Sequence, residues 1–354
     1  MKWLSVLLLS SFFSITILAA GSSVTPPESD STSRPPKHIP SNAPDQGNLP
    51  EEEDHGLLRG DQYDYLDHAK NSVYLTFAEN LQILDSFLSD GTLIEDETFH
   101  NRIRLMPYLV YQESDSSDYQ FKLDYYASIR LRRLEKRLSL IIDTGDLAPL
   151  PNTQPNEEDN DPQIGLQKRI LKGTSVKVGG KVRWPPVGYV IGTWSQGFQP
   201  IDWQMIPKYS VFYQTDEDGF GTGGNFLLGR WWDPIMLKSD TGFRITEATT
   251  GIEWASSVTL AHVWRLIEPT DRRPLVSARS YNEGIDLIYR ISGHISGHKT
   301  IDEHRVIANY RHPLRKNWLF FFVSPELFWQ RENNWAPEFR LRVGIDALFW
   351  GVTR

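Results

Sequence analysis

Basic side chains recur at every second position in several segments, where they could act together on anions. Guanidinium groups that line one passage can favour anionic solutes. Carboxylates share the same faces, so the bases could instead pair in a structural network that fills the interior, which is the more usual state of buried charge. The residues that we expect on these faces are Arg102, Arg104, Lys122, Asp124, Arg130, Arg305, Glu326, Arg340, Arg342 and Asp346, with Lys238, Asp240, Arg244, Asp286 and Arg290 continuing the series.

Three histidines lie close to carboxylates in one short segment, a composition that can bind zinc or copper. They are His294, His298 and His304, with Asp302 and Glu303 beside them. Their spacing matches no established ligand set. We therefore expect a polar outer loop here and no metal site.

Hydrolysis would need a nucleophilic serine with a histidine in reach. Ser256, Ser257 and His262 lie in one expected strand. Ser256 and His262 are six residues apart, which is about 20 Å at about 3.3 Å per residue, so they cannot form a dyad. The sequence has no Gly-x-Ser-x-Gly, no phosphate-binding loop and no paired-carboxylate motif. We expect neither catalysis nor a cofactor; a lipid-modifying enzyme would require a Ser/His pair that converges from different strands.

The composition narrows the class of protein. The mean hydropathy of −0.41 is too low for a helical membrane protein, whose spans need about 20 apolar residues, whereas the polar interior of a barrel lowers the average. Aromatic residues make up 12% of the 354 residues, as is typical of membrane-interface girdles. The chain has no cysteine, which excludes disulfides, thiolate chemistry and a lipoprotein anchor. The net charge of −8 argues against nucleic-acid binding.

The part of the chain before the strands divides into three segments. Residues 1–20 combine Lys2, an apolar run and small residues, which indicates a secretory signal peptide, with an uncleaved anchor as the alternative. Residues 21–55 are rich in Pro, Ser and acidic residues, which predicts a disordered tether. Residues 56–90 carry apolar side chains every three or four positions, which predicts an amphipathic helix at the rim or in the periplasm, where it could engage a periplasmic partner.

Residues 98–350 alternate apolar and polar side chains with the period of a strand. The clearest segment, 119–131, is longer than the usual globular strand of about 5–6 residues and fits a tilted membrane-spanning strand of about 9–11. Short turns alternate with longer loops, and residues 146–162 are expected to form a long exposed outer loop. We predict an all-β antiparallel transmembrane barrel of 12–14 strands, at about 99–112, 119–131, 138–144, 164–171, 175–184, 188–195, 205–215, 223–231, 236–246, 252–265, 282–292, 303–311, 318–330 and 337–350.

Tryptophans gather near the ends of these expected strands. An indole satisfies both its apolar ring and its N–H at the membrane interface. The alternative is a set of core tryptophans in a soluble β-sandwich. The residues expected at the interface are Trp184, Trp231, Trp232, Trp318, Trp329, Trp335 and Trp350.

The last strand carries a local motif. Residues 342–349, Arg-Val-Gly-Ile-Asp-Ala-Leu-Phe, resemble the C-terminal assembly signal of bacterial outer-membrane β-barrels, with Gly344 and Phe349 at its glycine and aromatic positions. Ala347 is smaller than the usual residue, and five residues follow the aromatic. The resemblance implies a Gram-negative outer-membrane protein that contacts outer-membrane lipid and the barrel assembly machinery.

Two functions fit this resemblance. The first is porin-like passage of small solutes, anionic ones included. The second is a non-conducting barrel that holds a periplasmic partner through the helix at 56–90.

Overall fold

Strict two-residue alternation gives each segment one polar and one apolar face, and the segments satisfy their backbone groups by pairing side by side. The computed structural model describes residues 57–58, 64–72, 99–113, 118–130, 138–144, 149–152, 161–216, 219–266, 281–296, 298–316 and 318–353. The expected signal peptide and tether lie outside these residues.

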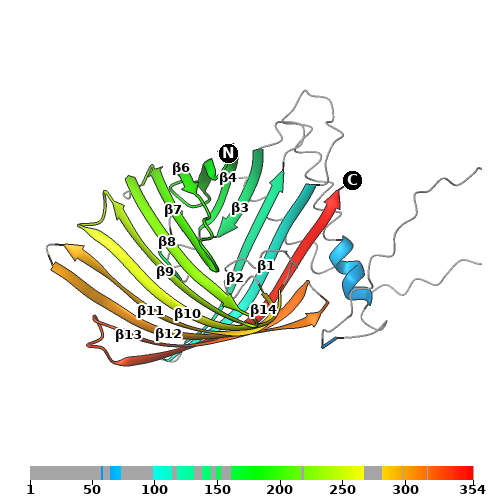
Figure 1. Ribbon diagram of the computed structural model, residues 1–354. Helices are drawn as coiled ribbons and strands as arrows, with labels where there is room; N and C mark the ends of the chain where they lie inside the picture. Colours follow the sequence, from blue (N-terminus) through cyan, green and yellow to red (C-terminus); the bar gives the residue numbers. More distant parts are fainter. Residues whose placement is uncertain are drawn as a thin grey trace, which may run out of the picture. The chain divides into compact units, whose positions relative to one another are not determined.

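The strands within the described residues are long and follow one another closely (Figure 1). They are β1 (Phe99–Gln112), β2 (Asp118–Arg130), β3 (Leu138–Thr144), β4 (Pro162–Leu171), β5 (Thr174–Lys181), β6 (Val187–Ser195), β7 (Trp203–Gln214), β8 (Phe220–Trp232), β9 (Ile235–Thr246), β10 (Ile252–Leu266), β11 (Tyr281–Ser296), β12 (His298–Arg315), β13 (Leu319–Gln330) and β14 (Pro337–Thr353).

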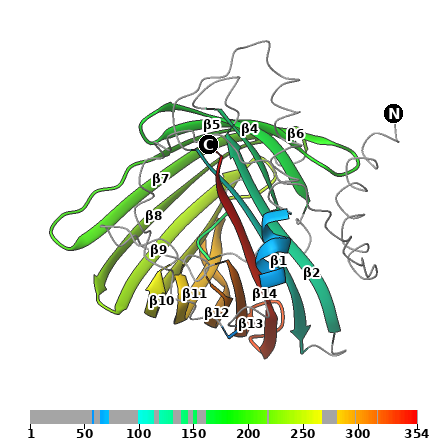
Figure 2. The same ribbon diagram turned by 90° about the vertical axis from the view of Figure 1, so that its right-hand side faces the viewer.

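Every strand pairs antiparallel with its sequence neighbours, and the first and last strands close the cylinder. The β1–β14 ladder runs from Phe99 opposite Thr353 to Gln112 opposite Arg340. Figures 1 and 2 both show β1 and β14 side by side. The predicted antiparallel barrel is therefore confirmed, with fourteen strands in the described part of the chain.

The two ends of the barrel differ in what they carry. The terminal rim holds the start of β1, the end of β14 and the β4–β5, β8–β9 and β12–β13 turns. The loop rim holds the β3–β4, β5–β6 and β13–β14 connections. Strand length also varies around the wall, from seven residues in β3 to eighteen in β12.

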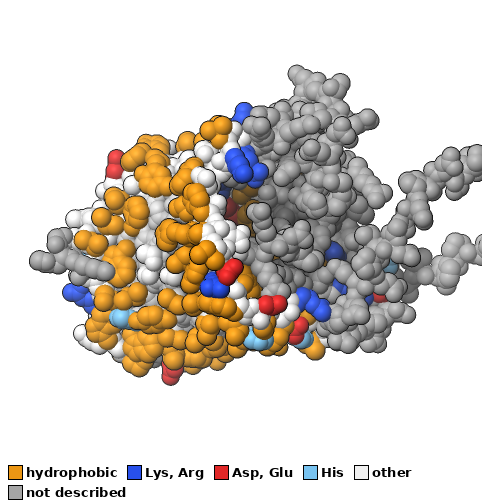
Figure 3. All heavy atoms as spheres, viewed as in Figure 1, with side chains coloured by type: hydrophobic (Ala, Val, Ile, Leu, Met, Phe, Trp, Pro, Cys, Tyr) orange, Lys and Arg blue, Asp and Glu red, His pale blue; other side chains and the backbone are white. Residues whose placement is uncertain are grey.

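The two faces of the sheet carry opposite kinds of side chain. Apolar residues such as Val258, Leu260, Ile285 and Leu287 point outward and are exposed, and Figure 3 shows hydrophobic side chains over the visible wall. Charged residues fill the inward face, and many of them are buried. This arrangement is the reverse of a soluble β-protein, whose apolar faces are buried.

A short helix occupies residues 64–72 within the described part of the chain. It confirms a helix ahead of the barrel, within the predicted range 56–90. Residues 57–58 of that range are not helical, and the others lie outside the described residues. None of the helical structure described here has the length and apolar character that crossing a bilayer requires.

Candidate functional site

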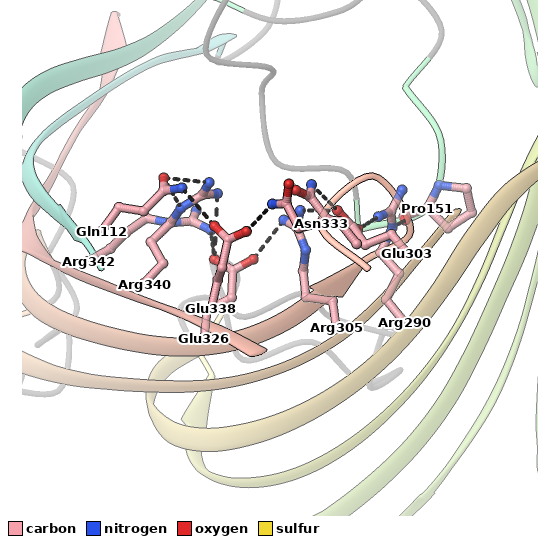
Figure 4. Close-up of polar contacts among 11 residues, drawn as sticks. Gln112, Pro151, Arg290, Glu303, Arg305, Glu326, Asn333, Glu338, Arg340 and Arg342 are labelled. Carbon is pink, nitrogen blue, oxygen red and sulfur yellow. Dashed lines mark hydrogen bonds and ion pairs between the residues drawn. The ribbon is translucent and has the colours of Figure 1, made fainter. Parts of the chain in front are cut away.

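The inward face of β11 to β14 carries a row of arginines that share carboxylates (Figure 4). Glu326 is the centre of the row, because the residue is only 1% exposed and its carboxylate meets three guanidinium groups. Arg305 and Arg342 each approach one of its oxygens to 2.6 Å, and Arg340 lies 4.0 Å away. We call this row, together with the members described next, the arginine wall.

A second group on the same wall lies nearer the terminal rim. Asp346 accepts a hydrogen bond of 2.8 Å from Arg104 Nε and pairs with Arg311 Nη2 at 2.8 Å. The Arg311 guanidinium also lies over the Phe320 ring, 3.9 Å from its centroid. The arginine wall thus consists, among described residues, of six guanidinium groups that share Glu303, Glu326 and Asp346; they are Arg104, Arg290, Arg305, Arg311, Arg340 and Arg342.

The third carboxylate, Glu303, links the arginine wall to a loop. Glu303 binds Arg290 at 2.6 Å and Arg305 at 2.8 Å. Arg290 Nε in turn donates a 3.0 Å hydrogen bond to the backbone carbonyl of Pro151. Figure 4 shows Pro151 beside Arg290, within the space that the strands enclose.

The loop that contains Pro151 was predicted to be exposed; among its described residues, 149–152, this holds for Pro149 and is wrong for Pro151. Pro151 is buried, and Asn152 Nδ2 donates a 2.6 Å hydrogen bond to Ser257 Oγ on the inward face of β10. The loop joins β3 to β4, which lie half-way round the barrel from β10 and β11. The described part of the loop, Pro151 and Asn152 above all, therefore lies in the interior, because polar groups of the β10 and β11 wall satisfy its backbone and side chain there.

The other wall of the interior is lined differently. Tyr189, Ile191 and Phe212 form a buried cluster. The Tyr189 hydroxyl lies over Gly165 and Gly179, where a Cβ would meet it at 2.6 and 2.7 Å, so these glycines make room for the ring. Lys177 lies over the Tyr189 ring and pairs with Asp143 at 3.2 Å.

The structure brings together some of the predicted interior residues and leaves others apart. Arg305, Glu326, Arg340 and Arg342 meet at one site, and Arg104 meets Asp346 at another. Asp124 is buried and accepts a 3.3 Å hydrogen bond from the Tyr108 hydroxyl. Lys122 lies two positions earlier on β2 and is partly buried. The side chains of Arg102 and Arg130 lie outside the described residues.

Two members of the arginine wall were missing from the predicted set of interior residues. Arg311 falls on the same face of β12 as Arg305, and Glu303 falls two positions before Arg305. The alternation could have identified both residues. They are the first and last residues of the strand predicted at 303–311, and β12 extends beyond both, from His298 to Arg315.

The predicted histidine loop is instead a strand hairpin, which corrects that interpretation. His294 lies on β11, pairs with Asp302 and is hydrogen-bonded to Thr300 Oγ1 at 3.0 Å. His304 lies on β12 and its Nδ1 is 2.7 Å from the Tyr289 hydroxyl; the His298 side chain is outside the description. No group of three or more His, Cys, Asp or Glu that could hold a metal occurs among the described residues.

Ser256 and His262 of β10, which were considered above as a catalytic pair, contact other residues. Ser256 Oγ lies 2.8 Å from Thr241 Oγ1. The His262 ring packs edge-on against Trp264 at 5.2 Å.

The tryptophans predicted at the interface have several environments. Trp184 is 89% exposed at the loop rim. Trp232 is exposed at the terminal rim, edge-on to Trp203 and beneath Arg230. Trp231 and Trp329 are half-buried, and Trp335 is exposed and packs against His304. The side chain of Trp350 lies outside the described residues. Trp318 is buried, and it contacts the helix at 64–72.

The two residues of the assembly motif are tightly packed. A Cβ on Gly344 would come within 2.5 Å of Pro107 O and Tyr108 Cβ, so the neighbouring strand leaves space only for glycine. Phe349 is buried in a cluster with Ile103, Ala127 and Ile129.

The helix at 64–72 is fixed to the terminal rim by Arg315, which is 2% exposed. Arg315 donates to the Leu58 carbonyl at 3.0 Å and to Asp64 and Asp67 at 3.0 and 2.9 Å. Asp67 also accepts the Trp318 indole N–H at 2.8 Å and pairs with Lys316 at 2.9 Å. We call this set of contacts the rim clamp.

The rim clamp changes the acidity of Asp67. Burial alone would raise its pKa, but hydrogen bonds from Lys316, Arg315 and Trp318 outweigh burial and lower the pKa from 3.8 to about 2. The carboxylate form is therefore the one that the clamp stabilises.

We expect the helix to be released by acid between about pH 4 and about pH 2. Because the pKa of Asp67 is lowered in the docked state, its contribution is present above the ordinary pKa and is lost as pH falls through about 2. The chain has no cysteine, so a fluorophore on Tyr65→Cys, an exposed position, can report anisotropy in this range. Asp67→Asn should give low anisotropy already at neutral pH; identical titrations of the two proteins would refute the assignment.

Comparison with known proteins places the chain in no family. No protein-family model matches it, and no curated protein is similar to it. Solved structures with some similarity include OpdO from Pseudomonas aeruginosa, with 8% identity, a TM-score of 0.42 and coverage of 73% of this chain and 98% of that one.

Two other porin structures show a similar level of similarity. The anion-selective porin from Comamonas acidovorans has 9% identity, a TM-score of 0.39 and coverage of 72% and 100%. OccK2 from Pseudomonas aeruginosa, solved in complex with glucuronate, has 7% identity, a TM-score of 0.41 and coverage of 73% and 100%. Similarities at this level identify neither the family nor the function of the chain.

Proposed function

We propose that this protein is an outer-membrane channel that lets small solutes pass, with a preference for anions. One observation carries the proposal: a closed barrel exposes apolar side chains outward while the arginine wall faces its interior. A bilayer is the environment in which that distribution of side chains is stable, because exposed apolar surface is removed from water there.

The outward face supports a membrane position through the spacing of its aromatic residues. On β10 the outward row places Val258 and Leu260 between Trp254 and Trp264, which are ten positions apart. That separation is about 33 Å along a strand and about 25 Å across the membrane for a strand tilted by about 40°. The distance matches the apolar band of an outer-membrane barrel.

The interior supports a preference for anions. Glu303, Glu326 and Asp346 each serve two or more guanidinium groups, so positive charge is concentrated along the arginine wall. The described part of the β3–β4 loop is fixed beside Arg290, so solutes that pass the loop also pass the arginines. Fixed cationic groups at a narrow point attract anions and repel cations.

The proposal is tested with the purified full-length barrel in planar bilayers. We expect stepwise conductance, and in a potassium chloride gradient a reversal potential whose sign reports chloride preference. Replacing Arg340 by glutamine should move that potential toward zero, whereas Arg230→Gln, on the outward face beside Trp232, should not. A barrel that inserts into the bilayer but carries no current would overturn the proposal.

The rim clamp favours a second candidate, a non-conducting barrel that presents the N-terminal segment to a periplasmic partner. Arg315 and Trp318 hold that segment through several contacts, more than a passive tether needs. If a variant without residues 56–90 co-purifies with the same proteins as the wild type, this candidate is wrong. The conductance of the barrel is measured separately, so this result leaves the channel proposal untouched.

A further inference from the structure

The wall formed by β4, β5 and β6 is lower than the rest of the barrel. These strands have ten, eight and nine residues, and the chain around them is described without a gap from residue 161 to residue 216. By comparison, β7 has twelve residues, β10 has fifteen and β12 has eighteen. We call residues 162–195, which comprise β4–β6 and the turns between them, the short wall.

The length of β5 limits how much of a membrane the short wall can span. From Thr174 to Lys181 the strand is about 23 Å long at about 3.3 Å per residue. At a tilt of about 40° that length covers about 18 Å across the membrane, whereas the apolar band of an outer-membrane barrel is about 25 Å tall. The short wall is therefore several ångströms too low for a bilayer of ordinary thickness.

The turn at the terminal rim cannot supply the missing height. Gly173 has a φ of 80°, and a Cβ at this position would collide with the Ser195 carbonyl oxygen. Ser195 N–H donates a 2.7 Å hydrogen bond to the Gly173 carbonyl, which closes the turn against β6. Irregular backbone cannot satisfy its polar groups in contact with lipid, so this turn stays outside the hydrocarbon layer.

The β5–β6 turn bounds the short wall at the loop rim in the same way. Val182 N–H donates a 2.6 Å hydrogen bond to the Pro162 carbonyl. Arg183 pairs with Asp161 at 3.2 Å and with Asp216 at 2.9 Å. These ion pairs belong in water or among headgroups, so the hydrocarbon layer has to fit between the two turns.

The outward side chains of the short wall are apolar and uncovered. Ile164, Leu166, Val178, Val190 and Trp194 are each 40–51% exposed. The next strand, β7, continues this surface with exposed Tyr209 and Tyr213. The surface is therefore continuous with the apolar wall that we assign to lipid.

A protein partner that matched only the short wall would bury too little surface for a stable contact. Three strands spaced about 4.8 Å apart form a strip about 14 Å wide. With a height of about 20 Å the strip offers about 300 Å², whereas a stable protein–protein contact takes about 800 Å² from each partner. Lipid has no such requirement, so lipid is the occupant that this surface suits.

Accepting the proposed membrane position, we propose that lipid covers the short wall and that the bilayer there is thinner than at the opposite wall. The opposite wall is built around β12, which lies seven strands from β5 in either direction round the barrel. A bilayer adapts to a low apolar wall by thinning beside it, because the alternative leaves acyl chains against polar turns. The inference is a lipid-binding surface that selects short or disordered acyl chains.

The test places one spin label on each wall of the full-length barrel, which has no cysteine of its own. Val178→Cys lies midway along β5, and Leu260→Cys lies between Trp254 and Trp264 on β10; the native side chains are 51% and 52% exposed. In dioleoyl-phosphatidylcholine vesicles, collision rates with oxygen and with a water-soluble nickel chelate give the depth of each label.

We expect the label at position 178 to be about 3 Å shallower than the label at position 260, which is half the difference between bilayer heights of about 25 and about 18 Å. Lipids with longer acyl chains should deepen the label at 260 and leave the label at 178 in place, because the short wall sets the local thickness. A folded band in unheated gels shows that each labelled variant is intact.

Three other results would overturn the proposal, and they differ in what else they affect. Equal depths of the two labels in every bilayer would show that the thickness is the same at both walls. A label at 178 that neither reagent reaches would show that protein covers the short wall. If the nickel chelate reaches the label at 260 as readily as oxygen does, the barrel does not lie in the membrane, and the proposed function fails as well.

Discussion

Glu326→Gln is expected to destabilise the barrel by about 3–5 kcal/mol, because it removes the charge of a buried carboxylate and leaves its partners in place. Glu326 meets Arg305 and Arg342 at 2.6 Å, and Arg340 lies 4.0 Å away. Glutamine keeps the shape of the side chain, so a loss of stability reports uncompensated positive charge. Unfolding by urea in lipid vesicles, followed by tryptophan fluorescence, measures the change.

A control and a second substitution separate charge from packing. Glu253→Gln removes the partner of Arg244, at 2.7 Å and partly exposed, and should cost less than about 1 kcal/mol. Adding Arg342→Met to Glu326→Gln should restore part of the lost stability, since the double variant has one uncompensated charge fewer. Additive losses would contradict the shared-carboxylate network.

The same substitution should change ion selectivity. Glu326→Gln removes one negative charge from the arginine wall, so the reversal potential should move further toward the value for chloride. Arg305→Gln should move it in the opposite direction. Shifts of the same sign in both variants would contradict the position of this wall beside the conducting path.

The fold could be predicted from the sequence because alternation is a local property. A strand between lipid and a polar interior must alternate between apolar and polar side chains at every residue. The ladder between β1 and β2 is regular throughout, and the ladder between β1 and β14 is interrupted only near Pro107. The ends of β12 were less predictable. Pro313 suggested a turn, yet its carbonyl accepts a 3.2 Å hydrogen bond from Leu57, more than 250 residues earlier, and the strand continues to Arg315.

The site could be predicted only in part, for a related reason. Periodicity gives the face of a side chain, so Arg305, Arg340 and Arg342 were expected together. It gives no direction for a loop, because polar and proline-rich residues suit either water outside or polar walls inside. The contact of Pro151 with Arg290 depends on the barrel bringing β11 opposite the β3–β4 loop.

Trp318 shows the same limit in another setting. An indole at a strand end suits a membrane interface, but here it is 6% exposed and donates to Asp67. The partner lies 251 positions earlier, and no local pattern around Trp318 points to it.

Shortening the β3–β4 loop is expected to raise conductance several-fold, because the described part of this loop lies in the interior against the opposite wall. Thr144 pairs with Pro162 at the base of the loop, so Asn-Gly can replace residues 146–160 as a hairpin turn without moving the strands. Asp161 is retained because it pairs with Arg183. Single-channel recording measures the step size.

The charge of the loop predicts a second effect of the same change. Residues 146–160 hold Asp146, Glu157, Glu158 and Asp159 and no base, so removing them takes four negative charges from the protein. The larger channel should therefore select anions at least as strongly as the wild type, although widening alone weakens selectivity. A wider, less selective channel would place these carboxylates away from the solute path.

The control for this prediction is an exposed loop at the same rim. Residues 331–336 join β13 to β14, and Trp335 packs there against His304 on the outward face. Shortening that loop should leave the step size unchanged. Asn152→Ala, which removes the hydrogen bond to Ser257, should keep the mean conductance but add fluctuations between levels, because the described part of the loop then keeps the hydrogen bond from Arg290 and loses its second one. If the shortened β3–β4 loop and the control give equal step sizes, the loop does not limit the passage, and the narrowest point lies within the arginine wall itself.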